Sequence, residues 1–234
     1  IKPATLSGLR LGVPSGYFYT GLESETARLT EAALAKLKAA GVALVEVDLP
    51  GAGDVMGGMT FPIAMHEAMR DLPHYLNASK TGVNMADLVA QIASPDVGGI
   101  YKAMLKGDAA VPADVYQKAM VGREKFRKDV AQYFADNKLA GMIFPTTPAP
   151  ARLIASELGE FELNGQKAPT LQTFVRNTAI ASTAGTPGLV LPTGLTKEGL
   201  PVSLELDGPD GSDRSLLSIG MAMEALFGTL PSPK

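Results

Sequence analysis

Two neighbouring hydroxyls, Thr146 and Thr147, directly follow a short apolar run and stand between Pro145 and Pro148. Ligands of α/β proteins bind where strands end, so this position favours contact with a ligand. The hydroxyls could orient a substrate amide, or they could cap the carbonyls of an ordinary turn. The pattern alone leaves both interpretations open.

A second candidate for substrate contact is the stretch from Arg176 to Ser182, which mixes polar and apolar side chains. The amide of Asn177 and the hydroxyl of Thr178 can hydrogen-bond a substrate, and Ile180 can contact its apolar part. None of the three offers a nucleophile or base near neutral pH. We therefore predict that both segments bind substrate, through Thr146, Thr147, Asn177, Thr178 and Ile180.

The ionisable residues indicate pairing rather than metal binding. Arg176 could form an ion pair with Glu205 or Asp207, or with a carboxylate outside this chain. His66 and His74 are eight residues apart, which is not the i, i+4 spacing of a zinc helix. No third ligand stands near them in the sequence, so we predict no metal site and a packing or surface role for both.

No catalytic nucleophile is recognisable. The sequence has no adjacent pair of serines, no G-x-S-x-G and no S-x-x-K motif, and it contains no Cys. Acyl transfer through a covalent intermediate needs such an activated group. We therefore assign no catalytic residue to these 234 residues.

Two further patterns have ordinary alternatives. The glycines in residues 51–57 lie between a predicted strand and a helix, but their spacing does not fit a dinucleotide fingerprint, and no cofactor is predicted. Four methionines could line an apolar ligand pocket or fill the space between helices. They are Met56, Met59, Met65 and Met69.

The first fifty residues are expected to form a β-α-β unit. Apolar residues alternate in Leu9–Val13 and again in Val42–Val47, which predicts two strands. Helical spacing between them predicts a helix from Ser24 to Ala40, with Ser24 as N-cap and Gly41 as C-cap. The two strands should be parallel, with a right-handed connection.

The middle of the chain is expected to be mainly helical. Met56–Lys138 reads as about four helices, and Leu139–Phe144 as a third strand ended by Pro145. The predicted helix breaks are at Pro73, near Lys80 to Asn84, at Pro95 to Gly99 and at Gly107 to Pro112. Leu153–Thr170 is polar and irregular in pattern, which is typical of a surface excursion or flap.

The segment near the C-terminus packs several elements closely. Leu189–Leu191 and the alternating Val202–Leu206 predict two strands joined by a polar turn. Asp207–Ser212 predicts a second turn, after which Ser212 or Asp213 can cap a final helix.

The order of AGTPGLVLP, GLP, LDGP and a capped helix resembles the C-terminal signature of the amidase signature family, amide hydrolases with a Ser-Ser-Lys triad. VRNT, LELDGPDGSD and FPIAMHEAMRDLPHYL are most similar to the indoleacetamide and mandelamide hydrolases of that family. The resemblance spans nearly all of this chain but only the back half of the family's fold. It implies an α/β fold, with a mixed β-sheet covered by helices.

The resemblance also implies a mechanism. The parent enzyme would hydrolyse a small arylalkyl amide to acid and ammonia through an acyl-serine intermediate, with the triad in an N-terminal half that this chain lacks. The chain is therefore expected to be a fragment, inactive alone, whose partners are the substrate and that missing half. We expect one domain over 1–234, made of the unit 1–50, the helical region 56–138 and the strands, loops and helix of 139–234.

Composition narrows the class without naming the reaction. With 46% hydrophobic residues the chain can bury a sizeable core, and a net charge of −3 provides no basic stripe for nucleic acid or anionic membrane. The absence of Cys fits a reducing compartment, so a cytoplasmic location is expected. Self-association is possible, because half of a sheet leaves an unpaired edge.

Two other functions remain open. A noncatalytic α/β binding module would explain the missing nucleophile directly. A subunit similar to the glutamyl-tRNA amidotransferases of the same family would act in a complex with other proteins. The sequence upstream of Ile1 would separate them.

Overall fold

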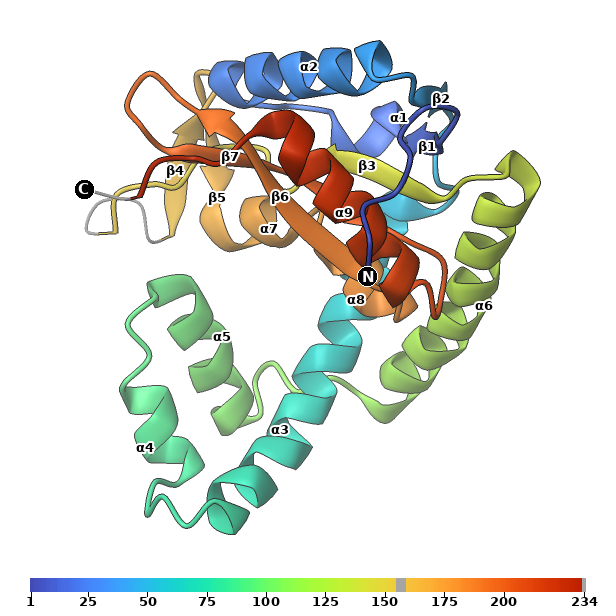
Figure 1. Cartoon of the computed structure of the whole chain (residues 1–234). Coiled ribbons are helices and arrows are strands. Elements are labelled where there is room, and N and C mark those ends of the chain that lie inside the picture. The colour runs from blue at the N-terminus through green and yellow to red at the C-terminus, as the bar shows by residue number, and fades with distance from the viewer. Residues whose placement is uncertain (155–158, 233–234) are drawn as a thin grey trace.

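The computed structural model describes residues 1–154 and 159–232 (Figure 1). Its main sheet has the strand order β2-β1-β3-β7-β6 and is mixed, because β1 runs parallel to β2 and β3 whereas β7 is antiparallel to β3 and β6. The strands are β1 (Arg10–Val13), β2 (Ala43–Glu46), β3 (Gly141–Pro145), β6 (Gly188–Leu195) and β7 (Pro201–Asp207). The five strands expected from the sequence are confirmed, and so is the mixed α/β class.

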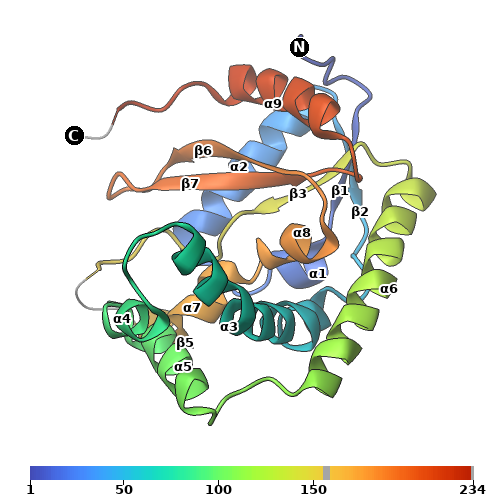
Figure 2. The ribbon, with the colours of Figure 1, turned by 90° about the horizontal axis from the view of Figure 1, so that it is seen from below.

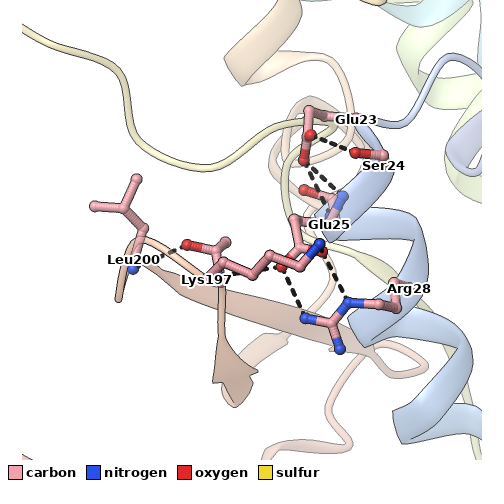
Figure 3. A network of polar contacts seen from close by, with 8 residues as sticks. Glu23, Ser24, Glu25, Arg28, Lys197 and Leu200 are labelled. Carbon is pink, nitrogen blue, oxygen red and sulfur yellow. Dashed lines mark hydrogen bonds and ion pairs between the residues drawn. The ribbon is translucent and has the colours of Figure 1, made fainter.

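The β-α-β unit forms as expected, with α2 (Ser24–Ala39) between the parallel strands β1 and β2. Its N-cap, however, is Glu23 rather than Ser24, because the Glu23 carboxylate accepts hydrogen bonds from the amides of Glu25 and Thr26 (Figure 3). The longer side chain reaches back over the first turn, while Ser24 Oγ donates to Glu23 Oε1 at 2.8 Å. At the other end Gly41 has φ 86°, a conformation that favours glycine.

The helical region contains a π-helical turn, Met56–Thr60, after a short 3₁₀ turn, Ala52–Asp54. Four helices follow: α3 (Phe61–Ala78), α4 (Met85–Ala90), α5 (Pro95–Lys106) and α6 (Ala113–Asn137). The predicted break at Pro73 is wrong, because α3 continues through it. A proline inside a helix removes one amide donor and crowds the carbonyl four residues before it, but the helix continues on both sides of Pro73. Pro95 starts a helix rather than ending one, since its fixed φ suits the first helical position.

The prediction that Leu153–Thr170 is irregular is also wrong in part. Residues 155–158 lie outside the described residues, but β4 (Glu160–Leu163) and β5 (Gln166–Pro169) form a two-stranded hairpin. The turn is Asn164-Gly165, with φ of 53° and 79°. Asn-Gly is the dipeptide that two-residue hairpin turns favour, so the signal was present in the sequence.

Helices cover both faces of the main sheet (Figures 1 and 2). On one face, α2 and α9 (Asp213–Phe227) pack on the apolar side of the β6–β7 hairpin. On the other face lie α1 (Ser15–Phe18), α6 and α8 (Ala179–Ala184). The short α7 (Thr170–Val175) leads into α8. The alternation predicted for Val202–Leu206 is confirmed, but both of its faces are covered.

Within the part of the chain that the structure describes, every helix is too short or too polar to span a lipid bilayer. Helix α9 begins after Ser212, which occupies the N-cap position without forming a side-chain capping bond. The predicted capping position is therefore confirmed, while the capping bond is not.

Candidate functional site

The loop between α7 and α8 is fixed by Asn177, which is completely buried. Its Nδ2 donates to the carbonyl oxygens of Phe18 at 3.1 Å and Pro145 at 2.6 Å, and its Oδ1 accepts from Arg176 Nε at 3.1 Å. One side chain thus ties together the end of α1, the end of β3 and its own loop. Because its donors and acceptor are engaged and no surface is exposed, Asn177 holds the loop in place from behind.

Arg176 pairs with backbone carbonyls and an aromatic ring. Its Nη2 donates to the carbonyls of Thr20 at 3.0 Å and Phe18 at 3.3 Å, and its guanidinium lies 5.6 Å from the ring centroid of Tyr17. Burial of the guanidinium lowers the pKa of Arg176. Among the described residues it forms no ion pair, so the expected pairing with Glu205 or Asp207 is not observed.

Ile180 lies in the core. It is completely buried, in the hydrophobic cluster between the sheet and α6 that includes Phe144 and Phe126. The reason is helical geometry: α8 begins at Ala179, and its first turn directs Ile180 toward the sheet while leaving Ser182 exposed. Residue types and spacing alone do not decide which side of this short helix is covered.

Thr178 lines an apolar cavity of about 370 Å³. The volume lies in the range typical of small-molecule pockets. The walls come from the π-helical turn, α3, α5, α7 and α8. The larger lining side chains are Met56, Phe61, Met65, Val97, Ile100 and Tyr101.

The methionines divide between the two roles that the sequence left open. Met56 and Met65 line the cavity. Met59 is buried in the core, and Met69 packs in a small separate cluster with the residues of α4. The π-helical turn decides this division for Met56 and Met59, because it changes the angular spacing that an α-helix would give them.

The hydroxyl of Thr60, in the π-helical turn at the cavity wall, is engaged in hydrogen bonds within the protein. Thr60 Oγ1 donates to the carbonyl of Val55 at 3.2 Å and lies 2.6 Å from Thr183 Oγ1, which then acts as the donor to Thr60. A smaller cavity of about 280 Å³ adjoins on the α6 side and shares Thr60, Ala64 and Ser182 with the first. Of these, Ser182 is exposed.

Thr146 and Thr147 lie at the end of β3, where the sequence predicted them, but they do not line the cavity. Thr147 Oγ1 donates to the carbonyl of Ala149 at 2.9 Å, which is the turn-capping alternative. Thr146 Oγ1 is buried without a hydrogen-bond partner.

The arrangement can bind and orient a small ligand. Residues 1–154 and 159–232 bring no three metal-ligating side chains together. His66 stacks on Tyr116 with ring centroids 4.2 Å apart, and its Nδ1 lies 3.1 Å from the carbonyl of Val111. An apolar cavity with hydroxyls at its edge suits the apolar group of a small neutral ligand.

Comparison with known proteins gives consistent results. Residues 2–217 match the family model described as Amidase. An indoleacetamide hydrolase of Agrobacterium vitis is 37% identical over 224 residues, covering 96% of this chain and 48% of the relative. A mandelamide hydrolase of Pseudomonas putida is 35% identical over 96% of this chain and 45% of its own length.

A crystal structure of an amidase superposes with a TM-score of 0.75 at 25% identity, covering 97% of this chain and 48% of that one. The chain thus spans about half the length of the curated relatives that it matches.

Proposed function

Because the chain belongs to the amidase family, we propose that the protein containing it hydrolyses a small arylalkyl carboxamide to the acid and ammonia. The observation that carries this proposal is the apolar cavity of about 370 Å³ beside Thr178. Its aromatic and aliphatic walls suit an aryl group, and the names of the indoleacetamide and mandelamide hydrolases among its relatives refer to amides with such groups.

The catalytic groups would come from polypeptide outside these 234 residues. In the proposed reaction a serine of a Ser-Ser-Lys triad attacks the amide carbonyl, ammonia leaves and water releases the acid. This chain has no adjacent serines to supply that triad. Its contribution would be the acyl-group pocket, sheet strands and the packing that fixes the pocket walls. In line with the absence of Cys, we propose a cytoplasmic location.

Within the site, we propose that Thr178 contacts the substrate directly. Asn177 and Ile180 would act behind it, by fixing the α7–α8 loop and the orientation of α8. Thr146 and Thr147 would act through the same loop, since Asn177 binds the carbonyl of the adjacent Pro145. Ser182, which lines both cavities and is exposed, is a further candidate for contact with the polar part of the amide.

The test is kinetic and uses the family-length protein, meaning a protein that contains this chain and matches its relatives in length. The substrates are indoleacetamide, mandelamide and propionamide. Ala64→Leu should narrow the cavity and lower kcat/KM for the aromatic amides by about tenfold or more relative to propionamide. Thr178→Val, which keeps the side-chain shape, should lower kcat/KM by a smaller factor. Thr173→Val is the matched control, because Thr173 is only partly buried, its hydroxyl donates to the Pro169 carbonyl and it does not line the cavity.

Two results would contradict the proposal. If the family-length protein hydrolyses none of these amides, the assigned reaction is wrong. If Ala64→Leu lowers kcat/KM equally for aromatic and aliphatic substrates, the reaction can stand but the cavity is not the acyl pocket. Residues 1–234 alone should give no turnover above buffer. Activity of this chain that survives repurification and is lost on its mutation would contradict the proposal that the catalytic groups lie outside it.

A further inference from the structure

Two buried carboxyls lie side by side on β7. Glu205 and Asp207 are two residues apart, so their side chains point to the same face of the sheet. Glu205 is 5% exposed and Asp207 is completely buried. Their neighbours across β3 are Phe144 and Met142, both apolar core residues, so the carboxyls lie in surroundings of low polarity.

Three of the four carboxyl oxygens lack a hydrogen-bond partner among the described residues. Both oxygens of Asp207 and Oε2 of Glu205 are buried without a hydrogen bond, and no Lys, Arg or His among the described residues lies within 4 Å of them. Burial raises the pKa of Glu205 to about 7 and the pKa of Asp207 well above its ordinary value. A buried carboxylate is strongly unfavourable unless a cation and donors compensate it.

The pair lies just beneath an open strand edge. Gly188 on β6 is opposite Asp207, and Val190 is opposite Glu205. A Cβ at Gly188 would lie 2.7 Å from Asp207 Oδ1 and 3.4 Å from Glu205 Oε1, so both carboxyls converge on a residue with no side chain. Gly188 is exposed, Val190 is 48% exposed, and β6 is an edge strand. Polypeptide that pairs with the β6 edge would therefore lie next to the residue on which the two carboxyls converge.

We propose that an arginine from polypeptide outside residues 1–234 docks beside Gly188 and pairs with Glu205 and Asp207. The curated relatives are about twice as long as this chain, so such polypeptide has a counterpart in them. A guanidinium has donors on both edges and can bridge two carboxyls, which an ammonium does less well. The inference rests on the family assignment, but it concerns assembly and is independent of which amide is cleaved.

Pairing with a cation and sharing of one proton predict opposite signs for the change in stability that Asp207→Asn causes. If a cation binds both carboxyls, both are ionised at pH 8. Asp207→Asn then removes one of the two carboxylates that neutralise the buried cation and destabilises the protein. If the pair has only its shared proton, Asp207→Asn removes an unfavourable buried charge and stabilises the protein at pH 8. The two amide variants keep the shape of the side chains, so packing changes little.

The experiment measures thermal melting of the family-length protein at pH 8 and pH 5. Asp207→Asn and Glu205→Gln should each lower the melting temperature at pH 8 by about 5 °C or more, with a smaller shift at pH 5. Glu162→Gln, an exposed strand carboxylate of β4, is the control and should shift nothing.

Unchanged or higher melting temperatures for both variants at pH 8 would overturn the proposal. If Asp207→Asn does not fold, Glu205→Gln alone decides by the sign of its shift. If the variants separate a dimer of the wild-type protein in sedimentation, without changing the melting of the separated subunits, the cation comes from a second copy and the proposal fails. Hydrolysis is not the readout, so failure here leaves the proposed reaction untouched.

Discussion

Asn177 and Asp207 are both completely buried, yet their surroundings treat them in opposite ways. Asn177 has its amide nitrogen bound by two carbonyls and its oxygen bound by Arg176. Asp207 has no partner except Glu205 among the described residues. The difference shows that burial of a polar side chain does not mean that its hydrogen bonds and charge are satisfied. The described residues satisfy the hydrogen bonds of Asn177, whereas they enclose Asp207 without a counter-charge.

The largest effect is expected from Asn177→Ala. Removing the amide takes the Asn177 donor from the carbonyl of Pro145 and leaves the carbonyl of Phe18 with only the 3.3 Å hydrogen bond from Arg176, and each such loss costs on the order of 1–3 kcal/mol. We expect the free energy of unfolding to fall by about 3 kcal/mol in urea denaturation. Asn77→Ala, on an exposed position of α3, should change it by less than about 0.5 kcal/mol. A similar small change at both positions would show that the comparison is wrong.

Gly188→Ala tests how tightly the acidic pair is covered. The new methyl would lie 2.7 Å from Asp207 Oδ1, so the buried carboxyl must move within a packed environment. We expect a loss of about 1–2 kcal/mol, in the range of overpacked cores. Gly99→Ala, within α5 and with no atom near its added Cβ, should be neutral or stabilising. Equal stability of the Gly188 variant would mean that the pair has free space around it.

The pH dependence of residues 1–234 alone provides the next test. The pKa of Glu205 is raised from 4.5 to about 7, so the protonated form favours the folded chain. The stabilisation contributed by protonated Glu205 should be fully present below about pH 4.5 and should be lost as pH rises through about 7. Glu205→Gln should flatten that decrease in urea titrations at a series of pH values. A wild-type profile that rises over the same interval would contradict the assignment.

Glu25 sharpens the comparison with the smallest effect. Its carboxylate accepts two hydrogen bonds of 2.8 Å from Arg28 and lies 3.9 Å from Lys197 (Figure 3). The Arg28 hydrogen bonds lower the pKa of Glu25 to about 2, the opposite direction from Glu205. Its stabilisation is therefore present above about pH 4.5 and lost as pH falls toward 2. Glu25→Gln should lower the melting temperature slightly at low salt and not measurably in about 1 M salt, because exposed ion pairs are screened.

The elements with a clear periodicity were predictable from the sequence. The five strands, α2 and the final helix follow alternation or helical spacing that needs no distant contact. The family motifs also lie in the sequence itself, and the match over residues 2–217 confirms them. The β4–β5 hairpin was missed although Asn164-Gly165 marks its turn, because the polar strands beside it carry little apolar alternation.

The site was less predictable, because its residues meet only after folding. Thr178 was predicted from the sequence to contact substrate, which stays a prediction, and the cavity that it lines depends on Met56, Ile100 and Tyr101, which come from elements far earlier in the chain. The same holds for the role of Asn177, whose two carbonyl partners are 159 and 32 residues away.

The sequence by itself therefore determined the five strands of the main sheet, α2, the final helix and the family, since these depend on residue type, spacing and order. Tertiary structure alone decided which side of α8 would be buried, which methionines would line the cavity and that Glu205 and Asp207 would be enclosed. The physical reason is that a side chain's environment depends on what packs over it. An acidic residue on an alternating strand looks solvent-facing in the sequence, until α6 and α8 cover that face of the sheet.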